Sequence, residues 1–308
     1  MSYGWVTPAS QEAQPRARVI PYDSRQTMTR AAMRIARRFT ASCWPFYAGA
    51  FIALTLLGGC AMSLSPDRIA AIVASPDRSA VDRSNDLRRK PAELLTFIGV
   101  RPGMVALDVS AGRGYTTELV ARAVGPDGRV YGQTAPRDAG RPPPAQPEGA
   151  AAPAVPAMAA MTPPPALAER ARNPATSNIV PVVRPFQDPV PPEVAHGGLD
   201  LVTLVFNYHD LGFLGVDRAR MNRAIFDGLK RGGMYVIADH SGRSGTGISE
   251  SGTLHRVEEA FVVTEVEAAG FRLAAQGNFM RNPADPRDRN TPEPSMPKDE
   301  FVLKFVKP

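Results

Sequence analysis

The sequence predicts an α/β protein with a doubly wound, mostly parallel sheet of seven strands and an antiparallel pair at its C-terminal edge. Three observations predict this fold. Short apolar runs alternate with helical patterns, one run ends in an acidic residue and a glycine turn, and no helical pattern separates the last two runs. The 308 residues are 44% hydrophobic and 21% charged, which suffices for a core and argues against a wholly disordered chain.

The first strand–helix–strand unit follows a helical region at residues 66–100, in which Pro91 is expected to open a new helix at its first turn. The apolar run 104–109 is predicted to be a buried parallel strand. A glycine turn then leads into a helix at 115–124, and a second turn leads into a strand at 129–132. These segments together predict one βαβ unit.

Residues 135–165 interrupt this alternation. They contain ten prolines among many alanines and glycines and show no periodicity. Because proline donates no backbone hydrogen bond and disrupts helices, the segment is predicted to be an extended, disordered insertion without a binding role.

Beyond the insertion, helical and strand patterns alternate again up to the C-terminus. Helices are predicted at 166–172, 217–229 and 254–269, and strands at 178–183, 199–206, 234–238, 271–276 and 300–306. The last two strands have no helix between them and are therefore expected to pair antiparallel. Ligands of such sheets bind at the carboxyl ends of the strands.

The N-terminal region has the pattern of an export signal. No Lys, Arg, Asp or Glu occurs from Phe39 to Pro66, and three arginines at positions 34–38 precede this stretch. A basic segment, an apolar segment and a small-residue site in this order are typical of secretion signals.

The segment Leu57-Gly58-Gly59-Cys60 resembles the lipobox of bacterial lipoproteins, in which the cysteine is acylated and becomes the N-terminus. The resemblance implies lipidation at Cys60, a leader at 1–59, a tether at 60–80 and a domain at 81–308. It also implies a lipid-anchored, periplasm-facing protein of the cell envelope. Two alternatives remain open: an inner-membrane anchor, since the uncharged stretch is long enough to span a bilayer, and a cytoplasmic protein with a misassigned start.

The net charge of +6 does not indicate a nucleic-acid partner. Residues 1–59 contain seven arginines and two acidic residues, so they supply +5 of the total. The rest of the chain is nearly neutral and offers no expected basic face. The two cysteines, Cys43 and Cys60, lie inside and at the end of the leader, so the mature chain is expected to lack disulfides and thiolate metal sites.

The first predicted strand ends in Asp108 and is followed by a turn of small residues, Val109-Ser110-Ala111-Gly112-Arg113-Gly114. Gly112 and Gly114 let a ligand approach the backbone closely because no side chain intervenes. Dinucleotide-binding turns have a similar geometry, but their G-x-G-x-x-G pattern lacks its third glycine here. A nicotinamide-dependent oxidoreductase is therefore the least favoured function.

The segment resembles motif I of class I S-adenosylmethionine-dependent methyltransferases, in which an acidic residue precedes three alternate glycines. Ser110 replaces the first of these glycines, and Gln133 and Thr134 stand where the family places an acid that binds the ribose hydroxyls. The resemblance implies S-adenosylmethionine as cofactor and methyl transfer to an O, N or S atom of a small, unidentified acceptor. It implies cofactor contacts at Asp108, Ser110, Gly112, Gly114, Gln133, Thr134, Phe186 and Asn207.

The resemblance extends beyond this turn, over residues 80–135 and 166–308. The segments 229–240, 255–259, 267–271, 281–283 and 301–305 resemble a group of predicted bacterial methyltransferases, many with exported N-termini. The implied fold is the Rossmann-like methyltransferase fold.

Four polar residues are the candidates for catalysis: Tyr208, His209 and Asp210 after the fourth strand, and His240 at the end of the fifth. Neighbouring strand ends would bring them, with Asp239 and His255, around one acceptor pocket. Methyl transfer depends mainly on alignment, and a histidine that titrates near neutrality suits the removal of a proton from the acceptor. The alternative is that these residues are structural. No metal site is predicted, because no H-x-x-x-H or comparable spacing occurs.

A second class of function remains open. The serine in motif I and the missing ribose-binding acid favour a non-catalytic exported binding module with a degenerate cofactor site. An exported location also conflicts with the cytoplasmic supply of S-adenosylmethionine that family knowledge implies.

Overall fold

The structure is a computed structural model, and it describes residues 63–136 and 166–308. The predicted leader, Cys60 and nearly all of the predicted insertion lie outside these residues. In the described ranges, no helix is both long enough and apolar enough to span a membrane.

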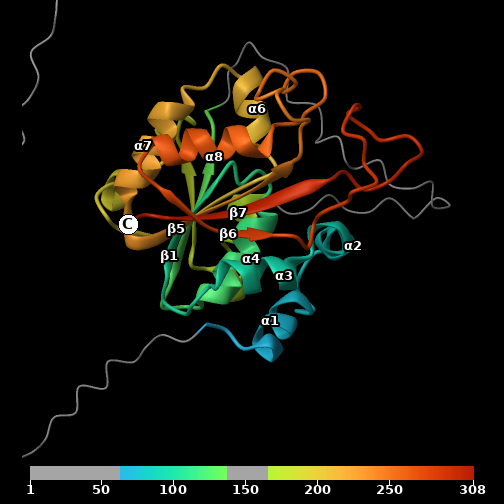
Figure 1. Cartoon of the computed structure of the whole chain (residues 1–308). Helices are drawn as coiled ribbons and strands as arrows, with labels where there is room; N and C mark the ends of the chain where they lie inside the picture. Colours follow the sequence, from blue (N-terminus) through green and yellow to red (C-terminus); the bar gives the residue numbers. More distant parts are fainter. Residues whose placement is uncertain (1–62, 137–165) are drawn as a thin grey trace, which may run out of the picture. The chain divides into compact units, whose positions relative to one another are not determined.

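Seven strands form one sheet in the order β3-β2-β1-β4-β5-β7-β6 (Figure 1). Strands β1 to β5 pair in parallel, and β7 pairs antiparallel with both β5 and β6. The predicted doubly wound sheet and its antiparallel edge pair are therefore confirmed. The strands are β1 (Val105–Val109), β2 (Arg129–Thr134), β3 (Ile179–Val183), β4 (Leu199–Val205), β5 (Leu229–His240), β6 (Arg272–Gly277) and β7 (Glu300–Val306).

Helices cover both faces of the sheet (Figure 1). On one side α1, α3 and α4 contact one another and α4 contacts β1 and β2, while on the other side α6, α7 and α8 contact β5, β6 or each other. The helices are α1 (Pro66–Val73), α2 (Ala80–Arg89), α3 (Pro91–Ile98), α4 (Tyr115–Val124), α5 (Leu167–Arg170), α6 (Tyr208–Phe213), α7 (Arg218–Gly228) and α8 (Glu259–Ala268), with 3₁₀ turns at Pro174–Thr176 and Pro192–Val194.

Successive side chains of the buried strands point to opposite faces of the sheet and belong to two separate apolar clusters. In β1, Ala106 belongs to the apolar cluster on the α3–α4 side, whereas Leu107 and Val109 belong to the cluster on the α7–α8 side. Successive side chains of a strand point to opposite faces, so a strand covered on both faces is apolar along its whole length. Asp108 is the exception, and its surroundings are described below.

The predicted helical region 66–100 begins with α1, whose Ile69 and Ile72 are buried. Helix α1 packs on α3 and α4. Other bounds differ from the sequence prediction: β5 begins at Leu229 and not at 234, and the short helix α6 was not predicted. The predicted helix 254–269 begins only at Glu259, because Val257 forms a bridge with Ser241 and the Arg256 guanidinium is buried against the carboxylate of Asp285. Asp285 lies 29 residues further along the chain, so the local sequence around Arg256 does not predict this contact.

Candidate functional site

The glycine turn lies between the carboxyl end of β1 and the start of α4. Ser110, Gly112 and Gly114 all have left-handed backbone conformations, with φ of 59°, 55° and 87°. A Cβ on Gly114 would lie 2.8 Å from Cδ1 of Leu167, so this glycine serves the packing of α5. A Cβ on Gly112 would meet only the carbonyl oxygen of Ser110, at 4.0 Å. Gly112 is therefore the point at which the turn leaves room for a ligand.

Asp108, the acidic residue of the motif, is buried. Its two carboxylate oxygens accept hydrogen bonds from the hydroxyls of Thr117 at 2.6 Å and Thr203 at 2.7 Å. Burial raises the pKa of Asp108 to about 6, although the two hydroxyls oppose the shift. Asp108 thus links β1 to α4 and β4, and a direct contact with a cofactor would require one of these bonds to be shared.

Gln133 is fully buried and both ends of its amide are occupied. Its Oε1 accepts the backbone N–H of Ser110 at 2.8 Å, and its Nε2 donates to the carbonyl of Arg184 at 2.6 Å. Gln133 therefore holds the glycine turn against the end of β3. The neighbouring Thr134 is only partly buried, and Phe186, also partly buried, packs against the core.

The residues around Gly112 therefore fit S-adenosylmethionine in part. The backbone cradle and the open side of Gly112 suit a ligand that approaches the carboxyl end of β1. The position of the ribose-binding acid fits less well, because the amide of Gln133 is fully buried and already bonded to Ser110 and Arg184, whereas the neighbouring Thr134 is partly exposed.

Three histidines converge at the ends of β4 and β5. His209 in α6 lies with Nδ1 2.6 Å from Oδ1 of Asp239, and its Nε2 lies 3.2 Å from Oδ1 of Asp210. Nδ1 of His255 lies 3.1 Å from the same Asp210 oxygen. The ring centroid of His209 is 5.3 Å from that of His240 and 5.7 Å from that of His255. The structure thus brings together the predicted candidates His209, Asp210 and His240, with Asp239 and His255.

The two buried histidines have opposite protonation preferences. Burial disfavours the charge on His209, but the carboxylates of Asp239 and Asp210 outweigh it and raise the pKa of His209 to about 10. Burial holds the pKa of His240 well below its usual range. At neutral pH the cluster therefore contains one charged imidazole and one neutral imidazole.

Tyr208 does not join this cluster. Its hydroxyl donates to Oε2 of Glu265 at 2.8 Å and accepts from Nδ2 of Asn222 at 3.0 Å, and the side chain is fully buried. Asn207, predicted to contact the cofactor, donates from Nδ2 to Oδ2 of Asp210 at 2.9 Å. The structure therefore places Asn207 beside the histidines and Tyr208 in the core.

Sequence reasoning missed a cationic group at the same end of the sheet. The guanidinium carbons of Arg88 and Arg89, in the last turn of α2, each lie 4.8 Å from the centroid of the Phe206 ring. Arg88 also pairs with Glu300 at 2.9 Å, and burial raises the pKa of Glu300 to about 7. The Phe206 ring stacks on His240, with centroids 5.2 Å apart. In the sequence, the two arginines look like ordinary basic residues at a helix end.

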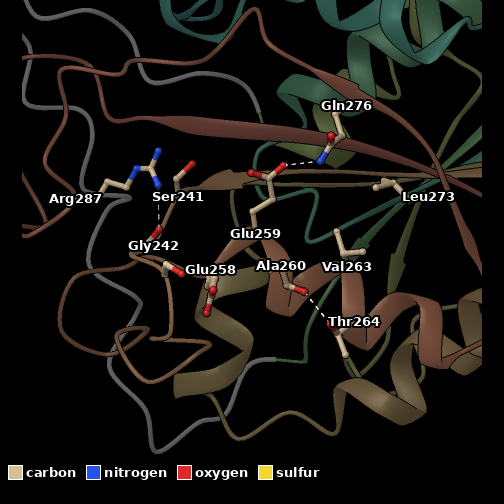
Figure 2. Close-up of a pocket in the computed structure, with 11 residues that line it drawn as sticks. Ser241, Gly242, Glu258, Glu259, Ala260, Val263, Thr264, Leu273, Gln276 and Arg287 are labelled. Carbon is tan, nitrogen blue, oxygen red and sulfur yellow. Dashed lines mark hydrogen bonds between the residues drawn. The ribbon is translucent and has the colours of Figure 1, made fainter.

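A separate open hollow of about 510 Å³ lies between α8 and β6 (Figure 2). Glu259 and Gln276 cross it with a 3.0 Å hydrogen bond, and Ser241, next to His240, lines its rim. The glycine turn contributes nothing to its lining.

No family model and no curated protein matches the sequence. Among solved structures, the chain is similar to an S-adenosylmethionine-dependent methyltransferase from Aquifex aeolicus, with 15% identity, TM-score 0.48 and coverage of 80% of this chain and 100% of the other. It is similar to an arsenic(III) S-adenosylmethionine methyltransferase from Chlamydomonas reinhardtii, with 18% identity, TM-score 0.42 and coverage of 67% and 64%. It is also similar to Aeropyrum pernix fibrillarin with bound S-adenosyl-L-methionine, with 17% identity, TM-score 0.39 and coverage of 67% and 68%. Such identities do not transfer an activity.

Proposed function

We propose that the protein is an S-adenosylmethionine-dependent methyltransferase acting on a small acceptor. The observation that carries the proposal is the glycine turn at the carboxyl end of β1, where, apart from its chain neighbours, no atom of the described residues lies closer than 4.0 Å to a Cβ placed on Gly112. In doubly wound sheets this end of the strands is where ligands bind. The histidine cluster at the adjacent ends of β4 and β5 supplies polar groups for an acceptor.

Different residues of the chain would serve different steps of methyl transfer at such a site. S-adenosylmethionine, when bound, supplies the methyl group on a sulfonium centre, and in-line transfer depends on how the acceptor is held. His240 is the candidate proton acceptor because it is uncharged at neutral pH, although burial holds its pKa below the near-neutral range that best suits a base. His209 carries a proton at neutral pH, and because its two ring nitrogens face the carboxylates of Asp239 and Asp210, it is a positioning residue that holds these groups in place.

The test is calorimetric titration of the full chain with S-adenosylmethionine and, separately, with NADH. We expect micromolar binding of the first and none of the second. Gly112→Ala is expected to weaken binding about tenfold or more, which is about 1.4 kcal/mol. Gly103→Ala is the matched control, because Gly103 also has a positive φ and no atom near its absent Cβ, yet lies in the turn before the opposite end of β1. Equal effects of the two substitutions would contradict the proposal.

The second candidate is a non-catalytic binding module on the same fold. The specific observation in its favour is Gln133, whose uncharged amide is buried and bonded to the backbone of Ser110 and Arg184 at the position where the ribose-binding acid is expected. If neither ligand binds the folded full chain, this function replaces the first.

We also propose that the chain is anchored in the cell envelope through acylated Cys60, on the sequence pattern that precedes this cysteine. Cys60→Ser is expected to abolish lipid labelling and to move the protein out of the membrane fraction. Normal processing and acylation of the variant would exclude the lipobox.

A further inference from the structure

We propose that His209, Asp210 and His255 form a binding site for one divalent transition-metal ion, with Zn²⁺ as the best match. One ligand atom from each of these three residues lies within 4.8 Å of the others. The inference does not depend on S-adenosylmethionine, because no residue of the glycine turn takes part.

The distances suit a small cation. Nε2 of His209 lies 3.2 Å and Nδ1 of His255 lies 3.1 Å from Oδ1 of Asp210. Ligands held about 2.0–2.1 Å from a tetrahedral zinc ion are about 3.4 Å apart, so two edges of the polyhedron are close to their final length. The third edge closes by a movement of His255, whose side chain is 39% exposed.

Supporting contacts fix the two ligands on α6. Asp239 engages Nδ1 of His209, which leaves Nε2 directed at Asp210. Because His209 is protonated at neutral pH, binding of the metal ion releases the proton of Nε2 to solvent. Nδ2 of Asn207 holds the other oxygen of Asp210 at 2.9 Å. A carboxylate behind the ligating histidine is a usual feature of metal sites, since it fixes the ring and strengthens its basic nitrogen.

His255 reaches the other two ligands from a strained backbone. Its φ is 49°, which is unusual for a residue other than glycine, and its side chain is held by Asp210. Such strain persists only when the surrounding structure imposes it, and it is common at functional sites.

The donor set selects the kind of metal. Two imidazole nitrogens and one carboxylate favour zinc and its transition-metal neighbours over Mg²⁺ and Ca²⁺, which prefer oxygen ligands. Three protein ligands leave at least one coordination position open, and the partly exposed Asp210 and His255 give that position access to solvent. The site is therefore of the exchangeable type and not a closed structural one.

The experiment is calorimetric titration of the untagged, chelator-treated full chain with Zn²⁺, repeated with Co²⁺ to record its visible absorption and with Mg²⁺ as a control. We expect one Zn²⁺ and one Co²⁺ per chain, and no binding of Mg²⁺. His255→Ala is expected to weaken Zn²⁺ binding at least about a hundredfold, and Asp210→Asn to weaken it about tenfold or more. His196→Ala, which changes the one histidine outside the cluster, is expected to leave the affinity unchanged.

Each of three results would overturn the proposal. They are a folded wild-type chain that takes up no Zn²⁺, a His255→Ala variant with wild-type affinity, and a His196→Ala variant that loses affinity equally. Circular dichroism and thermal melting of every variant establish that the protein compared is folded. Because His255 has its side chain partly exposed and contacts one carboxylate, its loss tests the site without removing a buried group.

Discussion

The carboxylate of Asp239 contacts His209 through both of its oxygens. One oxygen lies 2.6 Å from the ring Nδ1, and the other accepts the backbone N–H of the same residue at 2.8 Å. Asp239 belongs to β5 and His209 to the helix that follows β4, so one fully buried side chain fixes the relative position of two strand ends. This double contact is what orients the histidine cluster.

Asp239→Ala is expected to lower the free energy of unfolding by about 3–5 kcal/mol, because it leaves the buried Nδ1 and backbone N–H of His209 without an acceptor. Asp239→Asn keeps an acceptor for one N–H and is expected to cost less. Urea denaturation of both variants measures the difference. Asp188→Ala is the control, since its pair with Arg184 is partly exposed and is expected to contribute less than about 1 kcal/mol. If Asp188→Ala and Asp239→Ala lowered the free energy of unfolding equally, the buried contact would contribute no more to stability than the partly exposed ion pair.

The buried carboxyl of Asp108 predicts a pH-dependent stability. Its pKa is about 6 in the folded protein, above the ordinary value of 3.8, so between these values the folded state binds more protons than the unfolded state. Its contribution to the free energy of unfolding therefore falls as pH rises from about 4 to about 6, by about 3 kcal/mol in total. Subtracting the stability profile of Asp108→Asn from that of the wild type isolates this change.

A difference profile for Asp108→Asn that is flat across this range would contradict the assignment. Asp77→Asn provides the opposite case, because the bond from Arg122 lowers the pKa of Asp77 to about 2. Its contribution is present above about pH 4 and is lost as pH falls towards 2. The two difference profiles should therefore slope in opposite directions.

The sheet could be predicted from the sequence because strands and turns are indicated by residues that are neighbours in the chain. The run Glu300–Val306 is apolar at every buried position after Glu300, and it was predicted with the bounds that the structure shows. The turn at Gly112 follows from small residues placed directly after a strand. These features depend on neighbours in the chain, and a single sequence displays them.

The contacts of the candidate site residues could not be predicted, because their partners are distant in the sequence. Gln133 was expected to face a cofactor, yet Arg184, 51 residues away, occupies its amide. Tyr208 follows the fourth strand as expected, but α6 turns its side chain into the core towards Glu265. His255 reaches Asp210 across 45 residues, a juxtaposition that no ligand spacing in the sequence indicates.

Two of the three buried tyrosines in the apolar cluster on the α7–α8 side, Tyr208 and Tyr235, make a matched pair. Tyr208 has two hydrogen-bond partners for its hydroxyl, whereas the hydroxyl of Tyr235 is buried without one. Tyr208→Phe is expected to cost about 1–2 kcal/mol, because Asn222 and Glu265 lose a partner, and Tyr235→Phe is expected to be neutral or stabilising. Chemical denaturation compares them. A Tyr208→Phe variant of full stability but reduced ligand binding would restore Tyr208 to the site.

Arg170 connects the glycine turn to the helices that surround it. Its Nε donates to the carbonyl of Arg113 at 2.6 Å, one terminal nitrogen pairs with Asp82 at 2.7 Å, and the same nitrogen pairs with Glu118. Because the guanidinium and both carboxylates are buried, Arg170→Ala leaves Asp82 without its arginine and Glu118 with Arg122 alone, and it is expected to cost about 3–5 kcal/mol.

Arg170→Lys tests whether a positive charge at this position is enough to maintain the stability of the protein and the ligand affinity of the glycine turn. An ammonium group can approach one or two carboxylates, but it lacks the planar array of donors that reaches the Arg113 carbonyl as well. We therefore expect Arg170→Lys to recover part of the stability while ligand affinity at the neighbouring turn stays low. Arg223→Ala is the control, since its pair with Asp227 is exposed and its loss is expected to be within about 0.5 kcal/mol. Full recovery of both stability and affinity in Arg170→Lys would show that the turn does not depend on the bond to the Arg113 carbonyl.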